Sequence, residues 1–213
     1  MSKIINKIVK ILIMSDFFLN LGWGLLSPIF ALFILEKITM GNPMKAAEIA
    51  GFSALFYWIT KSFMEIPIGR FLDKHDGEKD DFWFMTLGLF VVAITPLGYL
   101  ISTEPWHIYF FQVVHATGMA MALPSWLAIF TRHIDKGKEA FEWSLETTSI
   151  SMGAGIAGGL GGIVASIFGF RILFIFVAGL TFFAALLLLL VKNNVSKRGD
   201  GFVSILEKPV VEP

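Results

Sequence analysis

The sequence contains no cysteine and few charged residues. Without cysteine the chain can form no disulfide, no thiolate metal site and no cysteine nucleophile. Only 16% of its 213 residues are Asp, Glu, Lys or Arg, whereas 55% are hydrophobic and the mean hydropathy is +0.72. A soluble domain carries roughly 25% charged residues and exposes much of its surface to water. The composition therefore predicts that lipid surrounds most of this chain.

Several function classes lack their sequence signals. The formal net charge is zero and no long basic run is present, so we expect no nucleic-acid partner. No phosphate-binding G-x-x-x-x-G-K-[ST] motif and no H-E-x-x-H metal motif occur. We therefore expect neither ATP-driven transport by this chain nor an enzyme, and no cofactor or metal.

Long apolar segments are abundant instead. A membrane-spanning helix needs about 20 apolar residues, and charged or Gly/Pro-containing breaks separate six segments of that length. The predicted spans are 11–35, 47–69, 82–101, 107–131, 145–168 and 170–191. Unpaired backbone groups are costly in hydrocarbon, and these segments are too long and too uniformly apolar for barrel strands. We expect an all-α, six-helix membrane domain over 1–191, followed by a flexible cytoplasmic tail over 192–213.

The basic residues predict the orientation of the domain. Most of the 17 Lys and Arg residues lie at the N-terminus, near 70–81 and 132–142, and in the tail. The other side of the predicted topology receives Lys37, Lys45 and Arg171. Cytoplasmic loops carry the excess of Lys and Arg, so both termini are expected in the cytoplasm of a multi-pass protein of the cell (inner) membrane.

Polar residues inside the first span share one helical face. Asp16, Asn20, Trp23 and Ser27 follow one another at spacings of four, three and four. One interpretation is a polar pathway in which Asp16 binds a proton or a cation. The alternative is hydrogen bonding that holds helices together.

Ionisable residues also occur in the second and fourth spans. Lys61 and Glu65 are four residues apart and can form an ion pair, or take part in a transport cycle when Glu65 is protonated. Gln112 and His115 lie near one another in the fourth span, and His115 could carry protons or satisfy a hydrogen bond. These four residues, with Asp16 and Asn20, are the candidates for transport or proton coupling.

The fifth span begins with acidic residues and then becomes rich in glycine. Glu142 and Glu146 are four residues apart near its start, where they can be solvated or favour the helix dipole. Small residues spaced by four allow two helix backbones to approach closely. The predicted helix-packing face contains Ser151, Gly155, Gly158, Gly159 and Gly162.

The loop after the second span resembles a known signature. Gly69, Asp73, Lys74, Gly77 and Lys79 match the loop between spans two and three of the major facilitator superfamily. The segment Gly22–Pro28, GWGLLSP, is similar to the first-span motif of drug/proton antiporters in that superfamily. The match corresponds to the N-terminal half of such transporters, which usually contain two six-helix halves.

The resemblance implies a half-size secondary transporter of a small solute, possibly a proton-coupled efflux protein. It implies a homodimer that restores twelve helices, and a signature loop that acts as a conformational latch against the partner's fifth helix. Two alternatives are a non-transporting scaffold or accessory subunit, and one half of a split transporter made of two different chains.

Overall fold

The computed structural model describes residues 5–74 and 78–194, and all regular elements in these ranges are helical. The longer ones are α1 (Lys7–Leu26), α3 (Pro43–Lys74), α4 (Glu78–Leu100), α5 (Pro105–His133) and α6 (Glu139–Leu188). The shorter ones are α2 (Phe30–Phe33), the π-helix η1 (Ile34–Ile38) and the 3-10 helix η2 (Leu189–Asn194). The all-α prediction is confirmed for the described residues. Gly77 and residues 195–213 of the predicted tail lie outside them.

Each predicted apolar segment lies largely within helix, and the boundaries follow local chemistry. The Asn6 side chain accepts a hydrogen bond from the Ile8 amide and so caps α1. At the start of α5, the His107 ring accepts the Glu104 amide at 3.1 Å, and Pro105 occupies a first-turn position where a missing N–H costs nothing. The fifth and sixth segments form one long element, α6, that departs from helical geometry at Gly169 (φ 75°). Glycine tolerates this positive φ, so the chain folds back there into a second arm.

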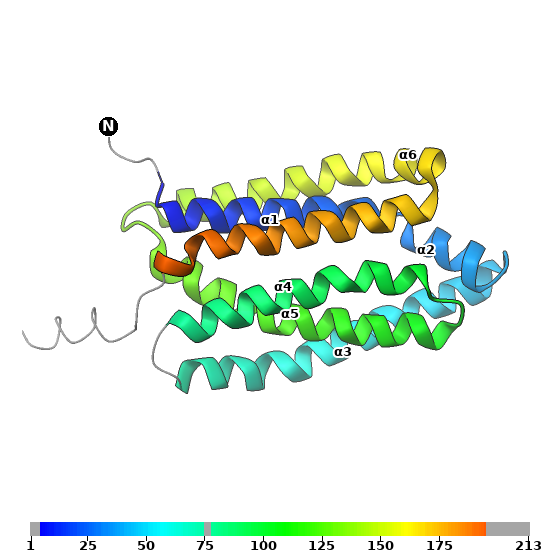
Figure 1. Ribbon diagram of the computed structural model, residues 1–213, viewed down its shortest axis with the longest axis horizontal. Coiled ribbons are helices and arrows are strands. Elements are labelled where there is room, and N and C mark those ends of the chain that lie inside the picture. Colours follow the sequence, from blue (N-terminus) through cyan, green and yellow to red (C-terminus); the bar gives the residue numbers. More distant parts are fainter. Residues whose placement is uncertain (1–4, 75–77, 195–213) are drawn as a thin grey trace, which may run out of the picture.

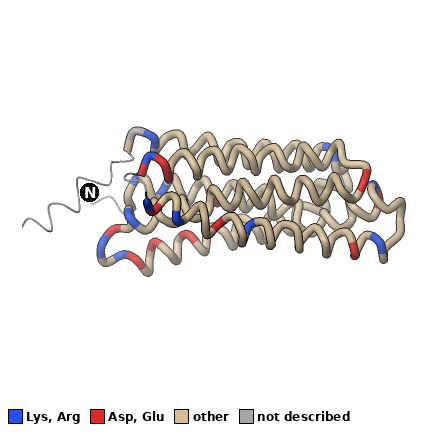
Figure 2. The backbone as a smooth tube through the Cα atoms, turned by 90° about the horizontal axis from the view of Figure 1, so that it is seen from below, with Lys and Arg blue, Asp and Glu red and all other residues tan. Residues whose placement is uncertain are grey.

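The helices form an elongated bundle (Figure 1). The element α1 packs along α6, whose second arm also contacts α4, while α5 packs against both α3 and α4. Figure 2 shows Lys, Arg, Asp and Glu gathered mainly at one end of the bundle, where α1, α4 and α6 begin, and we call it the charged end. The middle of the bundle is almost free of such residues, as expected for a body that crosses hydrocarbon.

Four helical regions are long and apolar enough to cross a membrane. They are Lys7–Leu26, Glu78–Leu100, Pro105–His133 and Glu139–Lys192. The last has 54 residues and contains the reversal at Gly169, so its two arms can each span a bilayer of about 30 Å. Helix α3 is not among them, and it carries Lys61 and Glu65 in its interior.

Glycines allow the helix pairs to approach closely. A Cβ added at Gly88 of α4 would lie 2.5 Å from the Gly118 carbonyl oxygen of α5, and one added at Gly118 would lie 2.7 Å from the Gly88 carbonyl oxygen. A Cβ added at Gly24 of α1 would lie 2.9 Å from the Ala157 Cβ of α6. Without a hydrophobic driving force between helices in lipid, this backbone contact supplies the van der Waals packing that holds them together.

We predict that Gly118→Val destabilises the bundle, because its side chain must force α4 and α5 apart. Overpacking of this kind costs about 1–3 kcal/mol or more in free energy of unfolding. The matched control is Gly51→Val, since a Cβ at Gly51 of α3 meets nothing within 4 Å. Denaturant unfolding in mild detergent, followed by circular dichroism, measures both variants. Equal stabilities would contradict the close contact.

Candidate functional site

Two largely apolar cavities of the bundle contain polar groups from several helices. The aromatic chamber is a cavity of about 240 Å³ between α1, α3 and α5. Its main polar and aromatic lining consists of Trp23, Tyr57, Trp58, Gln112 and His115. The acidic chamber is a cavity of about 180 Å³ nearer the charged end, between α1, α4, α5 and α6. Its main polar and aromatic lining consists of Asp16, Trp126, Trp143, Glu146 and Thr147.

The aromatic chamber is organised around His115. Its ring stacks on Trp23 of α1, with centroids 3.9 Å apart and planes 10° apart. Tyr57 of α3 lies on the same histidine, with centroids 4.8 Å apart. The predicted transport candidates Gln112 and His115 therefore share one cavity with Trp23 of the first-span stripe.

The ion pair predicted in α3 is present. The Lys61 ammonium donates to both carboxylate oxygens of Glu65 at 3.1 Å, and it lies 5.8 Å from the centre of the Trp58 ring. This pairing lowers the cost of placing both charges among apolar helices. It also places a fixed pair of opposite charges one turn from Tyr57 of the aromatic chamber.

The first-span stripe is divided between the two chambers. Asp16 lines the acidic chamber, whereas Trp23, seven residues or about 10 Å along the helix, lines the aromatic chamber. The Asn20 side-chain amide donates a hydrogen bond to the backbone carbonyl of Asp16 at 2.9 Å, so its partner lies within α1. The bond that links helices comes from Ser15, outside the stripe, whose hydroxyl donates to the Ala184 carbonyl of α6.

Glu146 is a further functional candidate. From the sequence, it was expected to be solvated or to favour the helix dipole. It is only 2% exposed, and its carboxyl group lies within hydrogen-bonding reach of Asp16 when one of the two carries a proton. The expectation of solvation is therefore wrong for Glu146, and also for Glu142, which is fully buried. The four-residue spacing of these glutamates put both on one helical face, but only the packing of α6 on α1 turns that face inward.

Among the described residues, almost nothing packs on the predicted glycine face of α6. A Cβ added at Gly155, Gly158 or Gly159 meets nothing within 4 Å, and at Gly162 it reaches only Ile29 at 4.0 Å. Ser151 is exposed and bonds within its own helix. The internal contact instead uses Gly153 and Gly161 against the backbone of α1.

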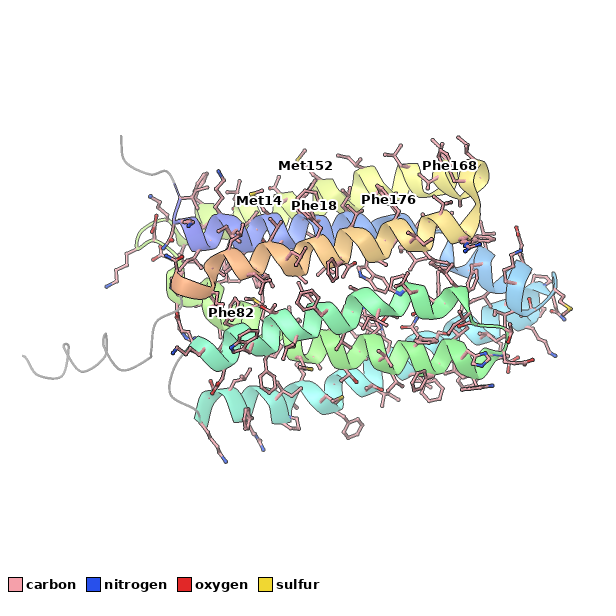
Figure 3. All side chains as sticks on the ribbon, in the orientation of Figure 1. Met14, Phe18, Phe82, Met152, Phe168 and Phe176 are labelled. Carbon is pink, nitrogen blue, oxygen red and sulfur yellow. The ribbon has the colours of Figure 1, made fainter. Side chains whose placement is uncertain are left out.

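The open face of α6 is bordered by large apolar side chains. Figure 3 shows Met152 and Phe168 pointing away from the bundle along the first arm of α6. These two side chains are 57% and 59% exposed. Packing of the glycine face against another chain stays a prediction.

The signature loop joins α3 to α4 at the charged end. Asp73 and Lys74 are exposed in the last turn of α3, and Lys79 is exposed in the first turn of α4. Gly69 lies one turn before Asp73 with open space beside it. The ring centroids of Phe71 in α3 and Phe84 in α4 lie 5.6 Å apart.

A buried ionic cluster at the charged end was not anticipated from the sequence. Arg132 at the end of α5 forms ion pairs with Asp81 and Glu78 at the start of α4, and His133 lies 3.6 Å from Glu78. Both carboxylates are almost fully buried. Opposite charges at adjoining ends of neighbouring spans could have indicated the cluster.

The fold and its cavities define a class of protein. The bundle of membrane-length helices, with ionisable groups facing internal cavities, is typical of a multi-pass membrane transporter. Residues 12–211 match the profile of the Major Facilitator Superfamily, and the chain belongs to that family. No curated protein matches the sequence. The predicted family is thus confirmed, and membership supports a transporter rather than an enzyme.

We predict that Arg132→Gln destabilises the protein by about 2–3 kcal/mol, somewhat less than the ~3–5 kcal/mol lost when a fully buried pair is broken. The substitution leaves Asp81 buried without its cation and removes one of the charged neighbours of Glu78. The double variant Arg132→Gln/Asp81→Asn should recover part of the loss, because one unpaired charge is removed. Denaturant unfolding of the single and double variants measures the coupling. Additive effects would contradict a direct pair.

Proposed function

We propose that this chain is a secondary active transporter that moves a small solute by alternating access, coupled to protons and acting in efflux. Family membership supports transport in general. The observation that carries the finer proposal is the arrangement of Asp16, Gln112 and His115 around two cavities inside a helical bundle. Intramembrane ionisable groups facing cavities mark solute and proton pathways.

The proposed topology has six spans with both termini in the cytoplasm of the cell membrane. Helix α3 would supply the remaining span, since the Lys61–Glu65 pair neutralises the charges in its interior. The charged end then faces the cytoplasm, in agreement with the excess of Lys and Arg expected there. The segment 192–213 would follow as a cytoplasmic tail.

The proposed functional unit is a homodimer. Transporters of this family usually contain two six-helix halves, and the solute passes between them. A second copy related by a two-fold axis would supply the other half. The open glycine face of α6 and the exposed aromatic side chains Phe52, Phe56 and Trp58 of α3 offer surface for such a contact.

The signature loop would then work as a latch. We propose that Asp73 faces the N-terminal end of the partner's α6, where the helix dipole attracts a carboxylate. Gly69, Lys74 and Lys79 would flank it, and Gly77 of the same signature lies outside the described residues. Closure at the charged end would favour the state that opens to the outside.

We predict that single-cysteine variants report the dimer directly, because the natural sequence has no cysteine. Gly155→Cys, on the open face, should form self-cross-links in native membranes. Gly179→Cys, on the second arm of α6, is the matched control, since a Cβ there also meets nothing within 4 Å. Cross-links are resolved by gel electrophoresis and mass spectrometry.

The identity of the cross-linked product separates the alternatives. A foreign membrane protein captured at Gly155→Cys would instead favour a scaffold role or a split transporter built from two different chains. Equal self-cross-linking of Gly155→Cys and Gly179→Cys would indicate random collision rather than a specific dimer.

We predict that Asp16→Asn uncouples transport from protons in proteoliposomes. An asparagine side chain cannot bind and release a proton as a carboxyl group does. Solute movement down its own concentration gradient should therefore persist, whereas a pH gradient should no longer drive it. A panel of solutes with an internal pH-sensitive dye measures both fluxes. Unchanged proton coupling would indicate that Glu65 or His115 binds the proton instead.

A further inference from the structure

The carboxylate of Glu146 lacks the partners that a buried charge requires. Neither of its oxygens has a hydrogen-bond partner among the described residues, and the side chain is 2% exposed at the wall of the acidic chamber. The carboxyl of Asp16 lines the same chamber, and it is also only an acceptor when ionised. A hydrogen bond between the two groups forms only when they hold a proton. Two ionised carboxylates this close would repel one another strongly.

The chamber supplies no positive charge to balance the pair. Among the residues that the structure describes, its lining contains no Lys, Arg or His. The lining residues of α4 and α5 are apolar except for the indole of Trp126, and α1 contributes Asp16. Helix α6 contributes Glu146, whereas Glu142, one turn earlier, is not part of the lining and accepts a hydrogen bond from the Asp135 amide. The balancing charge must therefore come from a proton or from a bound cation.

Two tryptophans indicate what kind of cation fits. Trp126 of α5 and Trp143 of α6 line the same chamber, with ring centroids 6.3 Å apart. Indole faces attract cations, most strongly where water is excluded. The cavity volume of about 180 Å³ is below the ~300–1,000 Å³ of sites for drug-sized ligands. The combination favours a small organic cation over a hydrated metal ion or a large drug.

We propose that Asp16, Glu146, Trp126 and Trp143 form a site for a small, single-ring organic cation that binds in exchange for the proton shared by the two carboxyls. The proposal rests on the proposed transport function and names its substrate class. With the proton bound the pair carries one negative charge. When the cation replaces the proton, both carboxylates are ionised and the occupied site again carries one negative charge. Exchange is therefore electroneutral: one cation enters as one proton leaves.

The test is a binding experiment that does not depend on transport. The full chain in lipid nanodiscs is titrated with benzyltrimethylammonium, which has one aromatic ring and a permanent charge but no proton to donate. Calorimetry in two buffers of different ionisation enthalpy gives the protons released per cation bound. We expect release approaching one proton. We also expect the dissociation constant to rise by up to about tenfold for each unit that pH falls, because the proton competes for the site.

Variants locate the site. Glu146→Gln should abolish proton release and weaken cation binding by about tenfold or more, whereas Glu146→Asp, which keeps an acid, should retain release. The matched control is Glu139→Gln, the same substitution at an exposed position of the same helix, and it should behave as the natural protein. Denaturant unfolding confirms that the variants are folded.

Three results would overturn the proposal. They are unchanged proton release in Glu146→Gln, no binding of benzyltrimethylammonium, and equally tight binding of its neutral analogue neopentylbenzene. Failure of the transport proposal would look different. Cation-linked proton release without flux in proteoliposomes would keep the site and remove the transport role, and flux without such release would remove only the site.

Discussion

The close contact between α1 and the first arm of α6 is the constraint on which both chambers depend. At Gly24, Gly153 and Gly161 an added side chain would clash with or crowd the facing helix, so the two backbones lie close together. In lipid, where apolar side chains gain little by leaving one hydrocarbon environment for another, such contact is a principal source of helix association. Once α6 is fixed in this register, Glu142 and Glu146 are turned inward.

The same register explains why two carboxylates meet in an apolar place. Gly153 packs on Phe17, the residue after Asp16, and Glu146 lies two turns before Gly153 on the same face of α6. Close packing therefore places both carboxyl groups at one chamber, where ionisation of both would cause electrostatic repulsion. A structure that stores this repulsion responds to any ligand that removes it, because a proton or cation bound at the pair stabilises the folded state by its own binding free energy.

The sequence predicted where the helices lie better than it predicted which face of each helix packs against its neighbours. Long apolar segments, the glycine at position 169 and the prolines at helix starts indicate helices and their ends through local chemistry alone. The Lys61–Glu65 pair also follows from spacing within one helix. The glycine stripe of α6 shows the limit: small residues occur on two faces of the same helix, and spacing cannot decide which one meets α1. The structure assigns Gly153 and Gly161 to that contact and leaves Gly155, Gly158 and Gly159 open.

Residue patterns within single helices could not predict the contacts between segments that are distant in the sequence. The Arg132 cluster joins residues 51 positions apart, and the Trp23–His115 stack joins α1 to α5. Both contacts depend on the order in which antiparallel helices become neighbours. The charged groups have different surroundings along the bundle. Among the described residues, ion pairs neutralise Asp81, Glu78 and Glu65, whereas no Lys, Arg or His lines the chamber that contains Asp16 and Glu146. A proton-linked transporter needs such a group, because a carboxylate already neutralised by a fixed arginine has little reason to exchange its partner during a cycle.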